Sequence, residues 1–277
     1  MKHKPADPNI AALLYQFENQ GWFWDGEIGK FRSGDTKVIS DLPWITQNLD
    51  FDCFGWNRLF HHGVAGGKMV HTHCQTCFKV VVAPRTFMEL LRLEEYQEQC
   101  GLRCKCGIET REYVSRTYGG YFYSWEPGDL ELMVYDEGEP EEGKEVPAFR
   151  VINDSGALRK GQLKYERIVK DMAEHVQIGD IPIPVILKRG CTEFEMHLGP
   201  TNLPQYRHIS DEQIALERAL DDNVEFTNQQ FVSKQPDAVK DAIRMRWAEW
   251  AHYIGDMTYV EWLGHALSVP PVTYHEE

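Results

Sequence analysis

"HTHCQTCFK" at residues 71–79 and "CGLRCKCG" at residues 100–107 are the two stretches of sequence that decide the fold of this chain, and together they hold five of its seven cysteines. A C-x-x-C turn directs two thiolates toward one point, and tetrahedral zinc then needs two further ligands from a second element. The residues between the stretches are numerous enough for one strand and one helix, which can bring the chain back. The sequence therefore predicts a metal site made of Cys74, Cys77, Cys104 and Cys106.

Over residues 71–107 these stretches resemble the zinc knuckles of zinc-ribbon and treble-clef proteins, and that resemblance implies a structural zinc ion. The second stretch departs from the usual C-x-x-C-G pattern, because Arg103 stands where its first cysteine is expected. Cys100, Cys191, His71 or His73 could therefore supply a ligand in place of one of the four cysteines named above.

Other interpretations of the cysteines stay open. Thiolates at irregular spacing also hold iron–sulfur clusters, so zinc and an iron–sulfur cluster are both candidate cofactors. Cys74 and Cys77 could instead form a redox dithiol, although the sequence around them lacks the strand and helix start that lower a thiol pKa. The cysteines could also be buried thiols, because cysteine packs as a small apolar residue.

Secondary-structure signals around the two stretches favour a mixed fold. Residues 79–83 form a β-branched run that predicts a strand. Thr86 and Glu89 form a capping box that predicts the start of a helix reaching almost to the second stretch. Two aromatic and β-branched runs, 111–115 and 121–125, flank a Gly-Gly pair and predict a β-hairpin.

The C-terminal part is expected to be mainly helical, and Ser210 with Gln213 suggests the cap of one of its helices. Acidic residues, prolines and glycines gather at 126–147, so we place a boundary there, between a β-rich region (1–147) and an α+β region (148–277) that could also form one integrated domain. Apolar residues at helical spacing between 239 and 254 predict an amphipathic helix that Gly255 ends. The expected class is α+β: a β-rich N-terminal half with a cysteine-rich metal-binding insert, arranged knuckle–strand–helix–knuckle–hairpin, and a helical C-terminal part.

A second group of polar residues falls where the sequence alternates like a strand. Cys191, Glu193, Glu195 and His197 would share one face of that strand. A thiol, two carboxylates and an imidazole at this spacing could serve a metal-dependent enzyme as acid–base groups. An amphipathic strand with its polar side toward water would show the same pattern, so whether the chain is an enzyme stays open.

Charge and hydropathy limit the partners. The net charge of −14 argues against broad, non-specific nucleic-acid binding, because an acidic surface repels phosphates. No apolar run is long enough to cross a bilayer, and no signal region follows Met1, so we expect a soluble, cytoplasmic protein. A nucleic-acid-binding zinc module would have to use the local basic residues, which are Lys79, Arg85, Arg103, Lys105 and Arg111.

The sequence thus favours a metal-binding protein, with zinc as the first choice, in which the Cys/His cluster stabilises the fold. Such a chain would serve an interaction or accessory role, with a protein partner or as a homo-oligomer. The alternatives are a metal-dependent enzyme, with an iron–sulfur redox centre or with zinc assisted by the polar strand face, and the nucleic-acid-binding module.

Overall fold

The computed structural model describes residues 22–27, 29–33, 44–48, 59–60, 66, 68–72, 74, 77–110, 114–124, 155–190, 210–225 and 235–268. The strands of these segments come mostly from the N-terminal half, and most of the helical residues come from the C-terminal part. The predicted α+β class is therefore confirmed.

An antiparallel sheet of five strands, in the order β3-β5-β6-β4-β7, forms the centre of the fold. In chain order these strands are β3 (Trp44–Gln47), β4 (Phe78–Val82), β5 (Cys104–Ile108), β6 (Tyr118–Tyr123) and β7 (Val185–Arg189). Strand β4 coincides with the predicted strand at 79–83. Strand β7 pairs with β4, so the sheet draws on both sides of residue 147.

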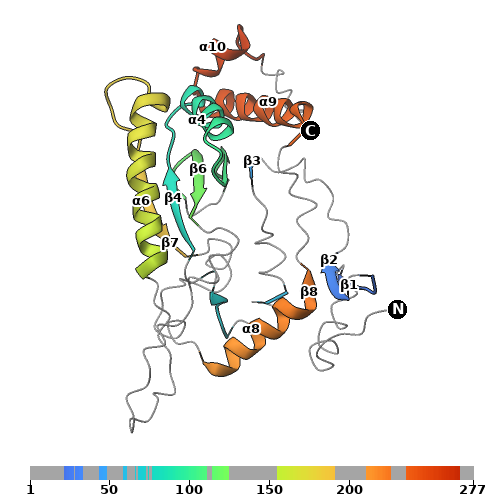
Figure 1. Cartoon of the computed structure of the whole chain (residues 1–277). Coiled ribbons are helices and arrows are strands. Elements are labelled where there is room, and N and C mark those ends of the chain that lie inside the picture. The colour runs from blue at the N-terminus through green and yellow to red at the C-terminus, as the bar shows by residue number, and fades with distance from the viewer. Residues whose placement is uncertain are drawn as a thin grey trace, which may run out of the picture.

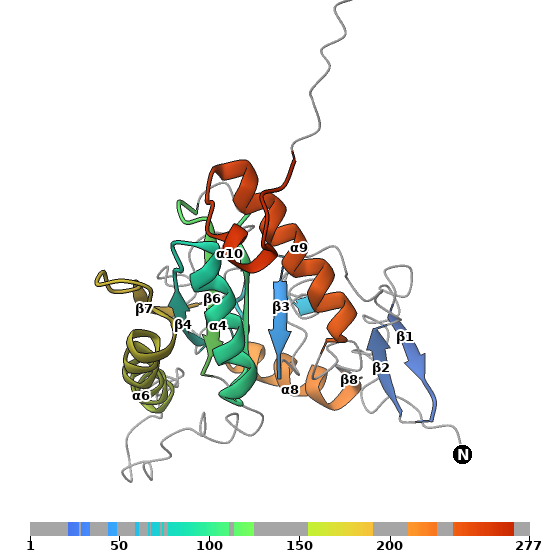
Figure 2. The same cartoon turned by 90° about the horizontal axis from the view of Figure 1, so that it is seen from above.

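Helices cover one face of this sheet (Figures 1 and 2). They are α4 (Phe87–Gln99), α6 (Ser155–Asp171) and α9 (Asp237–Ile254). The predicted start of α4 is confirmed, because the Thr86 hydroxyl accepts a hydrogen bond from the Glu89 backbone N–H at 3.2 Å. The predicted end of α9 is confirmed as well, since Gly255 follows it with a φ of 81°, a conformation that favours glycine.

Alternate residues of the strands face these helices and form the core. Val80 on β4, Phe122 on β6 and Cys104 on β5 lie in one row across the sheet, and all three are fully buried. In the next row, Gly120 lies against α4, where an added Cβ would overlap a Leu93 methyl group. The helices complete the core with buried apolar side chains, among them Leu90, Leu93, Ile168, Ile243 and Trp247.

The second cysteine stretch forms a strand and not a knuckle, which corrects the prediction. Cys104, Cys106 and Ile108 are all buried at alternate positions of β5, the two-residue period of a strand with one face in the core. The predicted hairpin is placed differently, because β6, which overlaps its second run, pairs with 104–108. Residues 111–113 of its first run lie outside the described residues.

A second, smaller sheet lies at the end of the molecule opposite α9 and α10 (Tyr259–Leu263) (Figure 1). It has the order β1-β2-β8. Its strands are β1 (Trp22–Asp25), β2 (Lys30–Ser33) and β8 (Val224–Glu225), the last directly after α8 (Asp211–Asn223). The predicted cap of α8 is confirmed, because the Ser210 hydroxyl accepts from Gln213 N at 3.1 Å. One π-helical turn, η3 (Met172–Val176), directly follows α6.

Candidate metal centre

The C-x-x-C pair lies directly before β4, at the end of the sheet. Cys74 and Cys77 are both half-buried. Cys74 N donates to the carbonyl of His71 at 2.9 Å, and the carbonyl of Cys77 accepts from Gly190 N, also at 2.9 Å. Gly190 directly follows β7 and has a φ of 103°, so the chain turns there in a conformation that favours glycine. Cys77, the second cysteine of the pair, therefore lies beside the last residue of the β7 segment that the structure describes.

Helix α8 anchors the segment before the cysteines. The Glu217 carboxylate accepts from Thr72 N at 3.1 Å and from the Thr72 hydroxyl at 2.5 Å. Gln213, one turn earlier, donates to the Val70 carbonyl at 2.8 Å and to Glu217 at 2.7 Å. These groups are buried, so the polar contacts fix residues 70–72 on the helix in a low-dielectric setting.

His71, a candidate ligand, is directed toward α8. Its Nε2 atom lies 3.7 Å from a Glu217 carboxylate oxygen, and its ring meets the ring of Phe60 edge to face at 4.9 Å. The side chain is almost completely buried. His71 thus belongs to the contact between residues 70–72 and α8.

Cys104 and Cys106 lie elsewhere, in the core under the helices. The register of the sheet separates Cys104 from Cys77 by two strand spacings, about 10 Å, and by three residues along β4, about another 10 Å. Burial raises the pKa of both thiols, Cys104 and Cys106, well above the ordinary value. The environment of Cys106 is the one expected of cysteine as a small apolar residue.

The four cysteines of the predicted site do not converge. Within the described segments, no three His, Cys, Asp or Glu side chains form a group that could hold a metal ion. His73, Cys191, Glu193, Glu195 and His197 lie outside the described residues, and a site that includes them stays a prediction.

Cys100, another candidate ligand, lies next to Cys104 and not beside the C-x-x-C pair. It follows the last residue of α4, and its thiol and the Cys104 thiol lie 3.5 and 3.8 Å from one acceptor, the carbonyl oxygen of Gln97. This pairing brings together two cysteines that the sequence places four residues apart.

Three of the basic residues proposed for nucleic-acid binding, Lys79, Arg85 and Lys105, are buried or engaged with other side chains. Lys79 is buried on β4, and Arg85 pairs with Glu89. Lys105 lies over the rings of Trp44 and Tyr121, at 4.8 and 5.6 Å from their centroids. Arg111 is outside the described residues.

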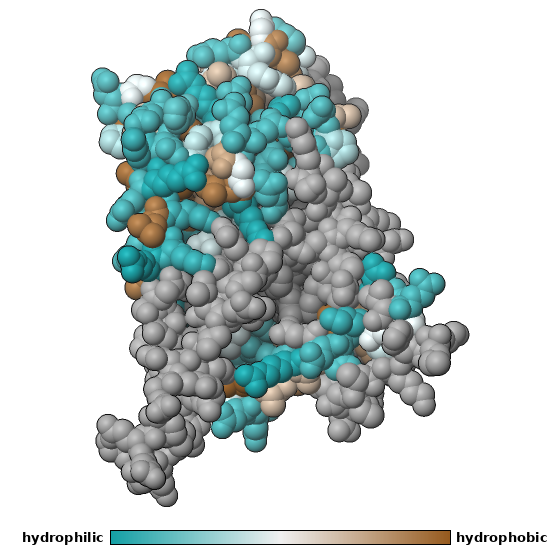
Figure 3. All heavy atoms as spheres, viewed as in Figure 1, coloured by the Kyte–Doolittle hydropathy of each residue, from teal (hydrophilic) through white to brown (hydrophobic). Residues whose placement is uncertain are grey.

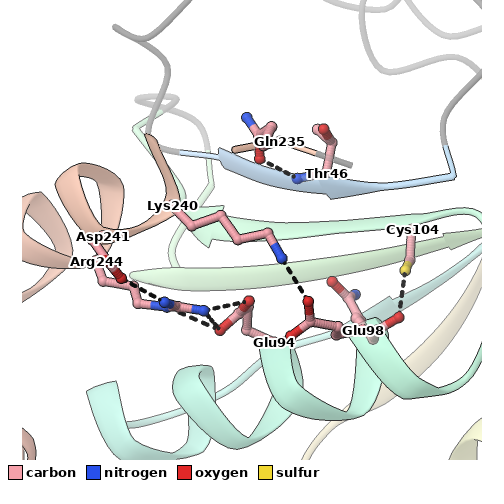
Figure 4. A network of polar contacts seen from close by, with 9 residues as sticks. Thr46, Glu94, Glu98, Cys104, Gln235, Lys240, Asp241 and Arg244 are labelled. Atoms are coloured by element: carbon pink, nitrogen blue, oxygen red, sulfur yellow. Dashed lines mark hydrogen bonds and ion pairs between the residues drawn. The ribbon is translucent and has the colours of Figure 1, made fainter. Parts of the chain in front are cut away.

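An ion network that the sequence analysis did not predict connects α4 and α9 (Figure 4). Lys240 Nζ donates to Glu98 at 2.8 Å, and Arg244 binds both oxygens of Glu94. Figure 4 also shows the Cys104 thiol directed at the end of α4, where it lies 3.8 Å from the carbonyl of Gln97. The sequence did contain an indication of this network. Lys240 and Arg244 fall on the same face of α9 as its apolar residues, which indicates that the element packed against this face carries acidic groups.

Comparison of the chain with protein-family models, with characterised proteins and with solved structures gives no match. None of the described helices combines the length and apolar character needed to cross a membrane. On the face drawn in Figure 3, hydrophilic residues predominate over the described part, and apolar ones occur as small separate spots. Single exposed apolar side chains are ordinary and mark no site.

Proposed function

We propose that this protein binds a structural zinc ion through Cys74 and Cys77 together with Cys191. One observation carries the proposal: the hydrogen bond from Gly190 N to the Cys77 carbonyl, at 2.9 Å. Cys191 is the next residue in the sequence after Gly190, so this contact supports a site that Cys191 shares with Cys77. The sequence offers His73 and His197 for the fourth position, so a Cys₃His set is the natural composition.

The expected role of the ion is to join chain segments that are distant in sequence. Residues 70–72 are fixed on α8, Cys77 leads into β4, and Gly190 ends β7. A tetrahedral ion held by thiolates from these segments would connect the sheet to α8. The free energy of metal binding then contributes directly to folding, since the unfolded chain has no preformed site.

Metal analysis of the native protein, prepared under reducing conditions, tests the proposal. We expect one equivalent of zinc, lost in Cys77→Ala and in Cys191→Ala. Cys106→Ala is the matched control, because it removes a buried thiol far from the pair and should keep the zinc. Circular dichroism of each variant shows whether the fold persists.

Three outcomes would overturn this proposal. The absence of bound metal would contradict the proposal. Brown protein that contains iron and acid-labile sulfide would indicate an iron–sulfur cluster in place of zinc. Loss of zinc in Cys106→Ala but not in Cys77→Ala would indicate that the zinc ligands are the cysteines of β5.

A further inference from the structure

Two thiols face each other where α4 ends and β5 begins. Cys100 follows α4, the chain turns back at Gly101 with a φ of 69°, and Cys104 opens β5. The two thiols share an acceptor, because the Cys100 thiol lies 3.5 Å from the carbonyl oxygen of Gln97 and the Cys104 thiol lies 3.8 Å from the same oxygen. The Cys104 thiol also lies 3.2 Å from the carbonyl oxygen of Leu102.

The two thiols differ in exposure and in charge. Cys100 is half-buried, whereas Cys104 is fully buried. The hydrogen bond from Cys104 lowers the pKa of Cys100 to about 7, with help from a backbone N–H of Leu102 and from the positive charge of Arg167. Burial raises the pKa of Cys104, and the neighbouring Cys100 thiolate raises it further. Above about pH 7, Cys100 is therefore mostly a thiolate, whereas Cys104 keeps its proton.

Other ionisable groups near the pair lie on α4, α6 and η3. From α6, Arg167 and Lys164 bring positive charge to Cys100 and Cys104 respectively. Asp171, also on α6, accepts a hydrogen bond from the Tyr96 hydroxyl of α4 and an ion pair from Arg167. The ring of His175 in η3 stacks on Tyr96 at 6.1 Å. Asp171 is thus engaged by the Tyr96 hydroxyl and by Arg167, while Arg167 and Lys164 bring favourable positive charge to Cys100 and Cys104.

We propose that Cys100 and Cys104 form a reversible redox pair that a hydroperoxide oxidises to a disulfide. The Cys100 thiolate attacks the peroxide oxygen, which breaks the O–O bond, takes up a proton, and yields a sulfenic acid and one molecule of water or alcohol. The Cys104 sulfur then displaces hydroxide from the sulfenic sulfur, and the Cys104 proton leaves with it as water. The two thiols lose two electrons in total, and the peroxide gains them.

The roles follow from position. Only Cys100 is open to a reagent from solvent, and it carries the thiolate, so it makes the first attack. Cys104 is shielded from solvent but already in contact with the sulfur that becomes oxidised. It therefore resolves the sulfenic acid before a second peroxide can react. Cys106 points into the same core two residues later, but its thiol is fully buried. This inference does not depend on the proposed zinc site, which uses other cysteines.

Tryptic mapping tests the proposal on the full-length protein, because the chain can be cut between the two cysteines at Arg103. Cys100 is then in peptide 93–103, Cys104 in 104–105 and Cys106 in 106–111. After a brief treatment with hydrogen peroxide, we expect peptides 93–103 and 104–105 joined, lighter by two hydrogen atoms than their sum. Dithiothreitol should separate them again, and a cysteine-alkylating agent added first should prevent the link.

Two variants complete the test. In Cys104→Ala, peroxide should carry Cys100 on to sulfinic acid, while Cys106→Ala should form the disulfide as the wild type does. Sulfinic acid at Cys100 in the wild type, with Cys104 still a thiol, would overturn the proposal. So would a link from Cys100 to any other cysteine, or an unchanged Cys100 under conditions that oxidise an exposed thiol peptide.

Discussion

Arg244 of α9 binds both carboxylate oxygens of Glu94 on α4. Its Nη2 atom donates to them at 2.9 and 2.8 Å, and its Nε atom donates to one of them at 3.1 Å. The Glu94 side chain is almost completely buried, whereas that of Arg244 is 21% exposed. Burial raises the pKa of Glu94, and the hydrogen bonds from Arg244 oppose that rise. The two helices are therefore joined by an ion pair inside the apolar core, next to the buried ammonium of Lys240.

Loss of the Glu94 carboxylate should destabilise the protein strongly. We expect Glu94→Ala to lower the free energy of unfolding by about 3 kcal/mol, because Arg244 then loses the buried carboxylate that compensates its desolvation, while Lys240 keeps its ion pair with Glu98. Urea denaturation measures this loss. Glu95→Ala, on the exposed side of the same helix, is the control and should cost less than about 0.5 kcal/mol. The double variant Glu94→Met/Arg244→Met should lose less than Glu94→Ala alone, and equal losses in the Glu94 and Glu95 variants would contradict the account.

Two adjacent glycines of β6 should respond differently to the same substitution. A Cβ on Gly120 would overlap the Leu93 side chain of α4, whereas one on Gly119 would meet nothing closer than 3.5 Å. Gly120→Ala should therefore cost about 1–3 kcal/mol through overpacking. Gly119→Ala should be near neutral, and Gly120→Ala/Leu93→Ala should lose less than the sum of its two single changes. Thermal unfolding of the four proteins checks this, and an equal loss at 119 and 120 would be evidence against the close approach of α4.

The sequence predicted those parts of the fold whose signals are local. The Thr86 cap, the start of α8 at Ser210 and the end of α9 at Gly255 each depend on a few neighbouring residues and one backbone conformation. The β-branched run at β4 has a similarly local signal. These elements appear where they were expected.

The prediction of a knuckle at the second cysteine stretch was wrong because cysteine can serve either as a metal ligand or as a small apolar residue. Counted as ligands, Cys104 and Cys106 suggest a knuckle; counted as apolar residues, they continue with Ile108 the period of a buried strand. Only the pairing of β5 with β6, a tertiary property, separates the two readings. The contact of Cys77 with Gly190 joins positions more than a hundred residues apart, so no local pattern could indicate it.

Glu217 should matter both for stability and for the proposed zinc site. Its carboxylate accepts three hydrogen bonds, from Thr72 N, the Thr72 hydroxyl and Gln213. Glu217→Ala leaves these buried donors without an acceptor and should cost about 2 kcal/mol or more. Because residues 70–72 lead directly to Cys74, we also expect the variant to release zinc at a lower chelator concentration than the wild type.

Glu212→Ala is the matched control, since Glu212 is exposed on the first turn of the same helix. It should change neither the unfolding midpoint nor the release of metal. If Glu217→Ala is destabilised but holds zinc as tightly as the wild type, the anchor on α8 is structural only and does not support the metal site.

The pH dependence of Cys100 alkylation tests the state of the thiol pair. With a pKa of about 7, the thiolate fraction of Cys100 rises about tenfold from pH 6 to pH 8. A cysteine with the ordinary pKa near 8.5 would show a rise of roughly 80-fold over the same interval. Cys104 stabilises the charged form of Cys100, so the reactivity of Cys100 persists as the pH falls toward 7 and is lost below that pH. Alkylation by iodoacetamide, followed on peptide 93–103, gives the rates at pH 6 and pH 8.

Two variants provide the controls. Cys104→Ala removes the donor and should raise the pKa of Cys100 and steepen the profile, whereas Cys104→Ser keeps a donor and should resemble the wild type. A steep profile in the wild type itself would mean that the two sulfurs do not share a proton in solution.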